Sequence, residues 1–189
     1  MGFKFEPGHI LLAEELRGFH LTNFVPSLLR LVTGNKVCHV AIVESCTPDT
    51  LTYWDASPKV GVHRYEIPNV WDTRESGILL SNDMVVSSIA VSPIQVTRFD
   101  IKADYNYAAI YALAKDHLLR RIGLPGADPD TSYGKKLVCS QYIGWLTLAT
   151  GGARMSELFP GVRHPAFIEP DNFLADPFKV IPMRELPQF

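Results

Sequence analysis

The strand that decides the fold reads Val37-Cys38-His39-Val40-Ala41-Ile42-Val43. It is short, it follows Gly34-Asn35, and its β-branched residues are typical of a strand buried on both faces. Alternation places His39, Ala41 and Val43 on one face of this strand. A single histidine in an apolar strand is most often a hydrogen-bonded core residue, so the role of His39 depends on its neighbours.

A second strand follows directly. The turn-forming residues Thr47-Pro48-Asp49 lead to Leu51-Thr52-Tyr53-Trp54-Asp55, in which Leu51, Tyr53 and Asp55 share a face. Pairing of the two strands brings Asp55 beside His39, where its carboxylate can accept a hydrogen bond from one imidazole nitrogen. Glu44 is the competing carboxylate, although alternation puts it on the face opposite His39 unless a bulge intervenes.

The rest of the chain predicts an α+β fold with a mostly antiparallel sheet. The helix that starts near Asp104 and ends before Gly123 carries an apolar stripe that includes Tyr107 and Tyr111, and we expect this stripe to face the core. Residues 124–136 are too polar and broken for regular structure. Further strands are expected over 9–13, 60–67, 78–80, 94–99 and 178–182, and further helices over 22–32, 139–150 and 170–174.

Cys139 opens the strongly apolar helix that ends at Gly151-Gly152. A thiol becomes a strong nucleophile as the thiolate, which both a helix N-terminus and a neighbouring histidine stabilise. The unpaired N–H groups of the same turn can also bind the oxyanion formed when a thiolate attacks a carbonyl. The alternative is that Cys139 is a small buried hydrophobic residue, as most free cysteines are.

Other cysteine and histidine arrangements are less consistent with known sites. Cys38, His39 and Cys46 lack the paired spacing of a structural zinc site, and alternation separates Cys38 from His39. His164 follows Cys139, but Pro160-Gly161 and Pro165 surround it, which favours a surface loop. We therefore expect neither a metal nor a cofactor.

Composition bounds the classes of function. The 189 residues, 47% of them hydrophobic, are enough for one core, which predicts a single domain over 1–189. Eighteen basic and 20 acidic residues give a formal charge of -2, which predicts no general electrostatic attraction to nucleic acid or to an anionic membrane. The sequence shows neither a signal peptide nor a membrane span, and three cysteines do not form the framework of a secreted domain. We expect a cytoplasmic setting with reduced thiols.

Four segments together resemble the permuted members of the NlpC/P60 papain-like superfamily, namely the YiiX-like cysteine hydrolases and, more remotely, the lecithin retinol acyltransferase group. The likeness extends to the tail from Ile168–Leu174 to Val180 and spans nearly the whole chain. The segments are the opening strand Glu6–Leu12, the histidine strand Val37–Val43, the acidic strand Thr52–Ala56 and the nucleophile helix Leu137–Ile143.

The resemblance implies a circularly permuted papain-like fold, in which a small antiparallel sheet packs on the helix that carries the nucleophile. Cys139, His39 and Asp55 then match the catalytic cysteine, histidine and third polar residue. Ser140, Gln141 and Tyr105 are the candidate substrate-binding residues. The chain departs from the family pattern at His9, where Asp is usual, at Asp55, where Glu or His is usual, and at Gln141, where Glu is usual.

The expected activity is cysteine-dependent hydrolysis of an amide, such as a peptide or cell-wall peptide, or of an ester or thioester, with His39 as the base. Partners are then a peptide, a lipid or another acyl substrate. An acyltransferase of the same fold and a catalytically inactive papain-like binding protein are the alternatives. A phage-encoded or host-intracellular setting agrees with the lack of a leader.

Overall fold

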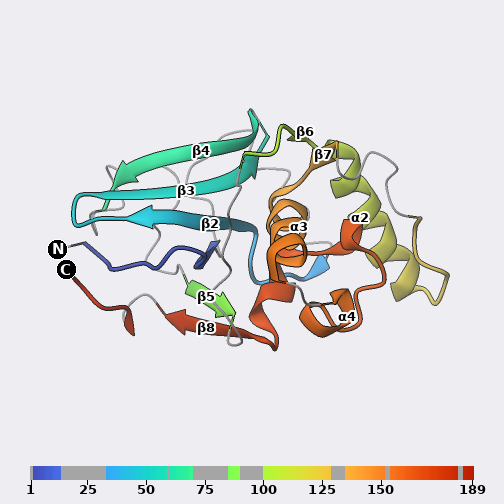
Figure 1. The fold of residues 1–189 in the computed structure, drawn as a ribbon. Coiled ribbons are helices and arrows are strands. Elements are labelled where there is room, and N and C mark those ends of the chain that lie inside the picture. The colour runs from blue at the N-terminus through green and yellow to red at the C-terminus, as the bar shows by residue number, and fades with distance from the viewer. Residues whose placement is uncertain are drawn as a thin grey trace.

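An antiparallel sheet of six strands, in the order β4-β3-β2-β1-β5-β8, forms the centre of the protein in the computed structural model (Figure 1). The structure describes residues 2–13, 33–58, 60–69, 85–89, 100–128, 135–151, 154–182 and 185–189. The strands are β1 (Ile10–Ala13), β2 (His39–Cys46), β3 (Thr50–Ser57), β4 (Gly61–Pro68), β5 (Val85–Ile89) and β8 (Phe178–Pro182).

Helices and short strands lie beyond one end of this sheet. Two residues of β6 pair in parallel with two residues of β7, directly ahead of the helices α2 and α3 respectively. The elements are β6 (Asp104–Tyr105), α2 (Tyr107–Arg121), β7 (Lys136–Leu137), α3 (Cys139–Gly151), α4 (Met155–Leu158) and the 3₁₀ helices η1 (Pro165–Phe167) and η2 (Pro170–Leu174).

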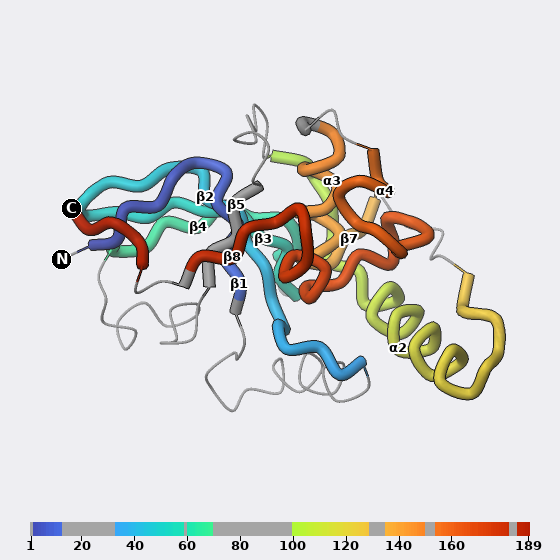
Figure 2. Tube along the Cα trace, turned by 90° about the horizontal axis from the view of Figure 1, so that it is seen from below, coloured from blue at the N-terminus to red at the C-terminus, as the bar shows by residue number. Residues whose placement is uncertain are grey.

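Both faces of the central strands are covered. In β2, Val40 and Ile42 pack with α3, whereas Ala41 and Val43 pack with the N-terminal segment around Phe3. This double burial explains why the strand reads as a continuous apolar run, as predicted from its sequence. Figure 2 shows β1, β2, β5 and β8 side by side, with both chain ends on the side of the molecule opposite α2.

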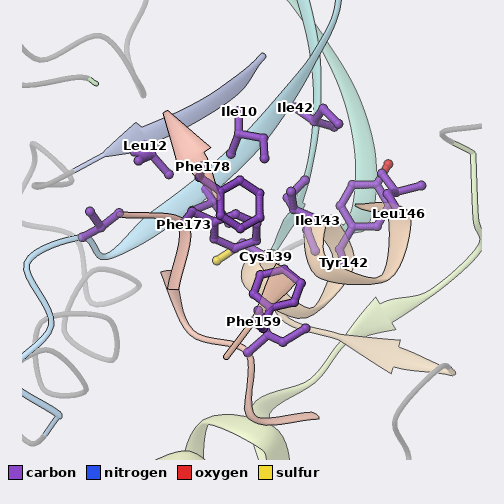
Figure 3. Close-up of a cluster of buried hydrophobic side chains, with 14 of the residues drawn as sticks. Ile10, Leu12, Ile42, Cys139, Tyr142, Ile143, Leu146, Phe159, Phe173 and Phe178 are labelled. Atoms are coloured by element: carbon purple, nitrogen blue, oxygen red, sulfur yellow. The ribbon is translucent and has the colours of Figure 1, made fainter. Parts of the chain in front are cut away.

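An aromatic group supports α3 from the C-terminal part of the chain. The rings of Phe159, Phe173 and Phe178 contact one another with centroids 5.1–5.5 Å apart. Figure 3 shows Cys139 among these side chains, together with Tyr142 and Ile143 of α3. The N-terminus of α3 is therefore held by packing between the sheet and the C-terminal segment.

The sequence-based expectations agree with most of these elements. Strands expected over 9–13, 37–43, 51–55, 60–67 and 178–182 and helices expected near 104–122, 139–150 and 170–174 all occur, with shifts of a few residues at their ends. β5 was not expected, and Lys136 forms β7 instead of ending a loop. The elements expected over 22–32, 78–80 and 94–99 lie outside the described residues.

One expectation about α2 is wrong. Its buried face consists of Ala109, Leu113 and Asp116, whereas Tyr107 and Tyr111 are 57% and 71% exposed. Periodicity correctly located an apolar stripe, but it could not tell which side of the helix the rest of the protein covers.

Gly61, at the start of β4, provides a test of how the sheet meets the segment before β6. Its φ is +69°, and a Cβ there would lie 2.3 Å from the Ala103 carbonyl oxygen. Gly34 has a similar φ of +79° but no atom within 4 Å of such a Cβ. Both alanine variants carry the backbone strain, so Gly61→Ala should lower the free energy of unfolding by about 1–3 kcal/mol more than Gly34→Ala.

Urea unfolding followed by circular dichroism measures this difference. Equal losses in the two variants would mean that the Ala103 segment gives way freely and does not restrain β4.

Candidate active site

Cys139 is the first residue of α3, and the local sequence determines how that helix begins. The carbonyl of Val138 accepts from the N–H of Tyr142 at 2.9 Å, and the Val138 N–H donates to Gln141 Oε1 at 3.2 Å. The N–H groups of Cys139 and Ser140 fall in the first turn, where helix geometry provides no intrahelical acceptor. The thiol thus lies at the positive end of the helix dipole, beside backbone donors.

His39, the first residue of β2, is bound to Asp55 of β3. His39 Nε2 and Asp55 Oδ2 are 2.8 Å apart, and only 9% of His39 and 3% of Asp55 are exposed. The register pairs Ile42 with Trp54. One further step places Asp55 opposite Ala41, diagonally adjacent to His39, as alternation predicted.

The imidazole of His39 also interacts with Cys139. Burial by itself would lower the pKa of His39, because desolvation disfavours the imidazolium. The charge of Cys139 and hydrogen bonds to Asp55 and Cys139 outweigh this effect and raise the pKa well above its usual value of 6.5. Since Nε2 is directed at Asp55, Nδ1 is the nitrogen left to exchange a proton with the thiol.

Asp55 is held by few contacts for a buried carboxylate. Its Oδ1 is buried and has no hydrogen-bond partner within the part of the chain that the structure describes. A buried unsatisfied oxygen costs about 1–3 kcal/mol, so this arrangement does not favour folding by itself. The hydrogen bond to His39 is therefore the main contact that stabilises the carboxylate. This is expected of a group that orients an imidazole and favours its charged form.

Tyr105 lies at the same site. It pairs with Leu137 in the β6–β7 bridge, two residues before Cys139. Burial, together with the charges of Cys139, Tyr107 and Asp55, raises the pKa of its phenol far above the usual value. Tyr105 therefore stays protonated near neutral pH and can donate a hydrogen bond.

Glu44 is engaged elsewhere. The register between β2 and β3 shifts between Val43 and Ser45, so a bulge does occur at this residue. Even so, Glu44 Oε2 accepts from Trp54 Nε1 at 2.8 Å and from Arg64 Nε at 2.7 Å. The carboxylate that reaches His39 is Asp55.

Ser140 and Gln141 fasten α3 to the segment around η1. Ser140 Oγ donates to the Ile168 carbonyl and Gln141 Nε2 donates to the Ala166 carbonyl, both at 2.7 Å. Both side chains are buried, with exposures of 1% and 0%. Their expected contact with substrate gains no support from this geometry, because their polar atoms already bind groups of the protein.

The other cysteines and histidines have different surroundings. Cys46 Sγ lies 3.2 Å from the Phe3 carbonyl oxygen, and burial raises its pKa. His164 caps η1 by accepting from the Ala166 N–H, and His117 bonds Glu169 at 2.5 Å. Across the described residues, no group of three or more His, Cys, Asp or Glu side chains is arranged to hold a metal ion.

A groove that the sequence did not indicate lies near the chain ends. Its volume is about 480 Å³, and its lining includes Lys4, Glu6, His9 and Lys179 but none of Cys139, His39 or Asp55. His9 Nδ1 accepts from the Glu6 N–H, and burial lowers the pKa of His9. The groove is separate from the candidate active site.

Comparisons with known proteins leave the family open. No family model matches the chain, and no curated protein sequence is significantly similar to it. Among the described residues, no helix has the length and apolar character needed to cross a membrane.

The raised pKa of His39 predicts a specific response to pH and to substitution of Asp55. Carbon-edited NMR of the histidine rings should show one imidazole that titrates well above 6.5. The pKa of His39 should fall in Asp55→Asn, because the imidazole remains buried while the carboxylate is lost. Disappearance of the signal in His39→Gln assigns it.

The pH dependence of the free energy of unfolding follows from the difference between the folded and unfolded pKa of His39. The folded pKa lies above the unfolded value, so the contribution of the pair to stability is complete below a pH of about 6.5 and is lost as the pH rises through the folded pKa. A His39 titration that is unchanged in Asp55→Asn would contradict the electrostatic coupling.

Proposed function

We propose that this chain is a cysteine-dependent hydrolase with a circularly permuted papain-like fold, in which Cys139 is the nucleophile, His39 the base and Asp55 the residue that orients His39. One observation carries the proposal. A cysteine at the start of a helix interacts with a buried histidine whose other nitrogen bonds a buried carboxylate. The histidine precedes the cysteine in the chain, which is the permuted order.

The proposed reaction follows from these contacts. His39 takes the proton of Cys139, and the thiolate attacks the carbonyl carbon of the substrate to form a C–S bond. Collapse of the tetrahedral intermediate breaks the bond to the leaving group, which receives the proton from His39. Water, deprotonated by His39, then attacks the acyl-enzyme and breaks the C–S bond, which releases the acid and restores the thiol.

Two kinds of donor are available for the oxyanion of the intermediate. The first-turn N–H groups of α3 lie beside the sulfur, and the protonated phenol of Tyr105 lies close enough to Cys139 for its pKa to respond to that residue. Such preorganised donors stabilise charge that develops only during reaction. We assign Tyr105 to substrate binding on this ground.

The scissile bond belongs to an amide, an ester or a thioester, all of which present the carbonyl that this mechanism needs. A peptide, including a cell-wall peptide, is the substrate class that the family resemblance favours. An acyltransferase would share the acyl-enzyme and differ in the acceptor, and an inactive binding protein would lack turnover. Thiol labelling and turnover of p-nitrophenyl acetate separate these alternatives.

Cys139 should be the most reactive of the three thiols. We expect iodoacetamide at neutral pH to label Cys139 at least about tenfold faster than Cys46, because the helix N-terminus and His39 support the thiolate at Cys139, whereas burial raises the pKa of Cys46. Mass spectrometry of digested protein at successive times gives the rates for all three cysteines. Equal or slower labelling of Cys139 in folded protein would overturn the proposal.

p-Nitrophenyl acetate provides the matching test of turnover. An acetyl group that appears on the Cys139 peptide and disappears with time indicates a hydrolase, and its transfer to an added amine or alcohol indicates an acyltransferase. Acetylation that neither water nor an added acceptor releases indicates a relative without turnover. Cys139→Ala, which removes the nucleophile, is the control for acetylation elsewhere.

Asp55 and Glu44 should differ sharply in the same assay. Asp55→Asn should slow acetylation of Cys139 by about 10²-fold, because the imidazole loses its orientation and the stabilisation of its charged form. Glu44→Gln is the matched control, because it also replaces a carboxylate with an amide. It should remain within about twofold of the wild-type rate, since it loses only a partly exposed ion pair with Arg64. The reverse pattern would remove Asp55 from the site.

A further inference from the structure

The helix α2 turns an apolar stripe toward solvent. Tyr107, Tyr111, Leu118 and Ile122 are 57%, 71%, 57% and 64% exposed. Their spacing of four, seven and four residues puts them on one side of the helix, because 3.6 residues complete a turn. Leu124, just past the end of the helix, is 51% exposed and extends the stripe. Burial of such a surface is favourable, so it indicates a docking face.

The charges beside this stripe are positive. Lys115 and Arg121 are exposed, and a helical projection at 100° per residue puts them on opposite sides of the stripe. The single acidic residue in the sequence of α2, Asp116, faces inward, where it pairs with Arg120 at 2.8 Å and Arg163 at 2.7 Å. The outer face of α2 therefore combines apolar side chains with basic borders, and the one acidic residue of the helix is turned away from it.

A second copy of the chain fits this face poorly. In a two-fold dimer built on α2, the same face meets itself, so Lys115 and Arg121 would approach their own copies without an acidic residue of α2 to pair with. An anionic bilayer offers the complementary arrangement. Tyrosine rings favour the headgroup level, leucine and isoleucine enter the acyl boundary, and lysine and arginine bind anionic headgroups.

We propose that the outer face of α2, formed by Tyr107, Tyr111, Leu118, Ile122 and Leu124 and bordered by Lys115 and Arg121, docks on the surface of an anionic lipid bilayer. The formal charge of -2 does not oppose this, because a charged headgroup interacts with the residues within a Debye length and not with the whole chain. The helix lies on the membrane surface and does not cross it.

The docking face adjoins the candidate active site. The Tyr107 ring packs edge-on against that of Tyr105 at a centroid distance of 5.0 Å, and Tyr107 Oη donates to the Pro58 carbonyl. Tyr105 in turn responds to the charge of Cys139. A chain docked through α2 would thus hold this site near the membrane surface, whether or not Cys139 turns over a substrate.

Sedimentation with sucrose-loaded vesicles tests the docking directly. The wild-type chain should sediment with phosphatidylcholine vesicles that contain phosphatidylserine and far less with pure phosphatidylcholine. Lys115→Ala/Arg121→Ala should weaken partition to the anionic vesicles by about 30-fold, at about fivefold for each charge. Leu118→Ser/Ile122→Ser should weaken it by at least about tenfold.

Matched controls keep each outcome interpretable. Phe189→Ser removes an apolar side chain that is 44% exposed at the C-terminus, at the opposite end of the molecule from α2 (Figures 1 and 2), and should bind as wild type. Lys4→Ala/Lys179→Ala removes two exposed charges outside α2, and Cys139→Ala removes the nucleophile; both should also bind as wild type. Circular dichroism and thermal unfolding verify that each variant is folded.

Three results would overturn the proposal. They are equal sedimentation with neutral and anionic vesicles, wild-type binding by either α2 variant, and a dimer in analytical ultracentrifugation that Leu118→Ser/Ile122→Ser converts to monomer. The last would show that a second copy covers the face.

Discussion

The buried hydrogen bond between His39 and Asp55 is the interaction on which the geometry of the site depends. It joins the first residue of β2 to β3, at the end of the sheet where α3 begins (Figure 1). Removed from water, the carboxylate acts on the imidazole with little screening, so this contact fixes the orientation of the ring and, together with the charge of Cys139, raises the pKa of His39. The other ring nitrogen of His39 is thereby left for the interaction with Cys139 that raises the pKa of the imidazole.

The second constraint is the attachment of α3. Ser140 and Gln141, next to Cys139, bond the backbone of residues 166–168, while the rings of Phe159 and Phe173 pack in the cluster that contains Cys139. A helix held only by apolar packing could slide or rotate, whereas buried hydrogen bonds specify one position. The C-terminal segment thus helps to place a thiol that lies about 30 residues earlier in the sequence.

Much of this arrangement could be predicted from the sequence. β2, β3 and α3 were expected close to their observed bounds, and alternation correctly brought Asp55 to His39. β5 was missed because Ser87 and Ser88 interrupt its apolar pattern. Its place between β1 and β8 is seen only from its pairing with both strands. The catalytic role of the site residues stays a prediction.

The sequence by itself determined β2, β3, the turn between them and the helix that begins at Cys139, because alternation, helical periodicity and turn residues are local properties of the chain. Only the tertiary structure decided which face of α2 is buried and that Ser140 and Gln141 bind the protein's own backbone. Burial depends on which distant segments pack against an element, and a local pattern contains no record of those segments.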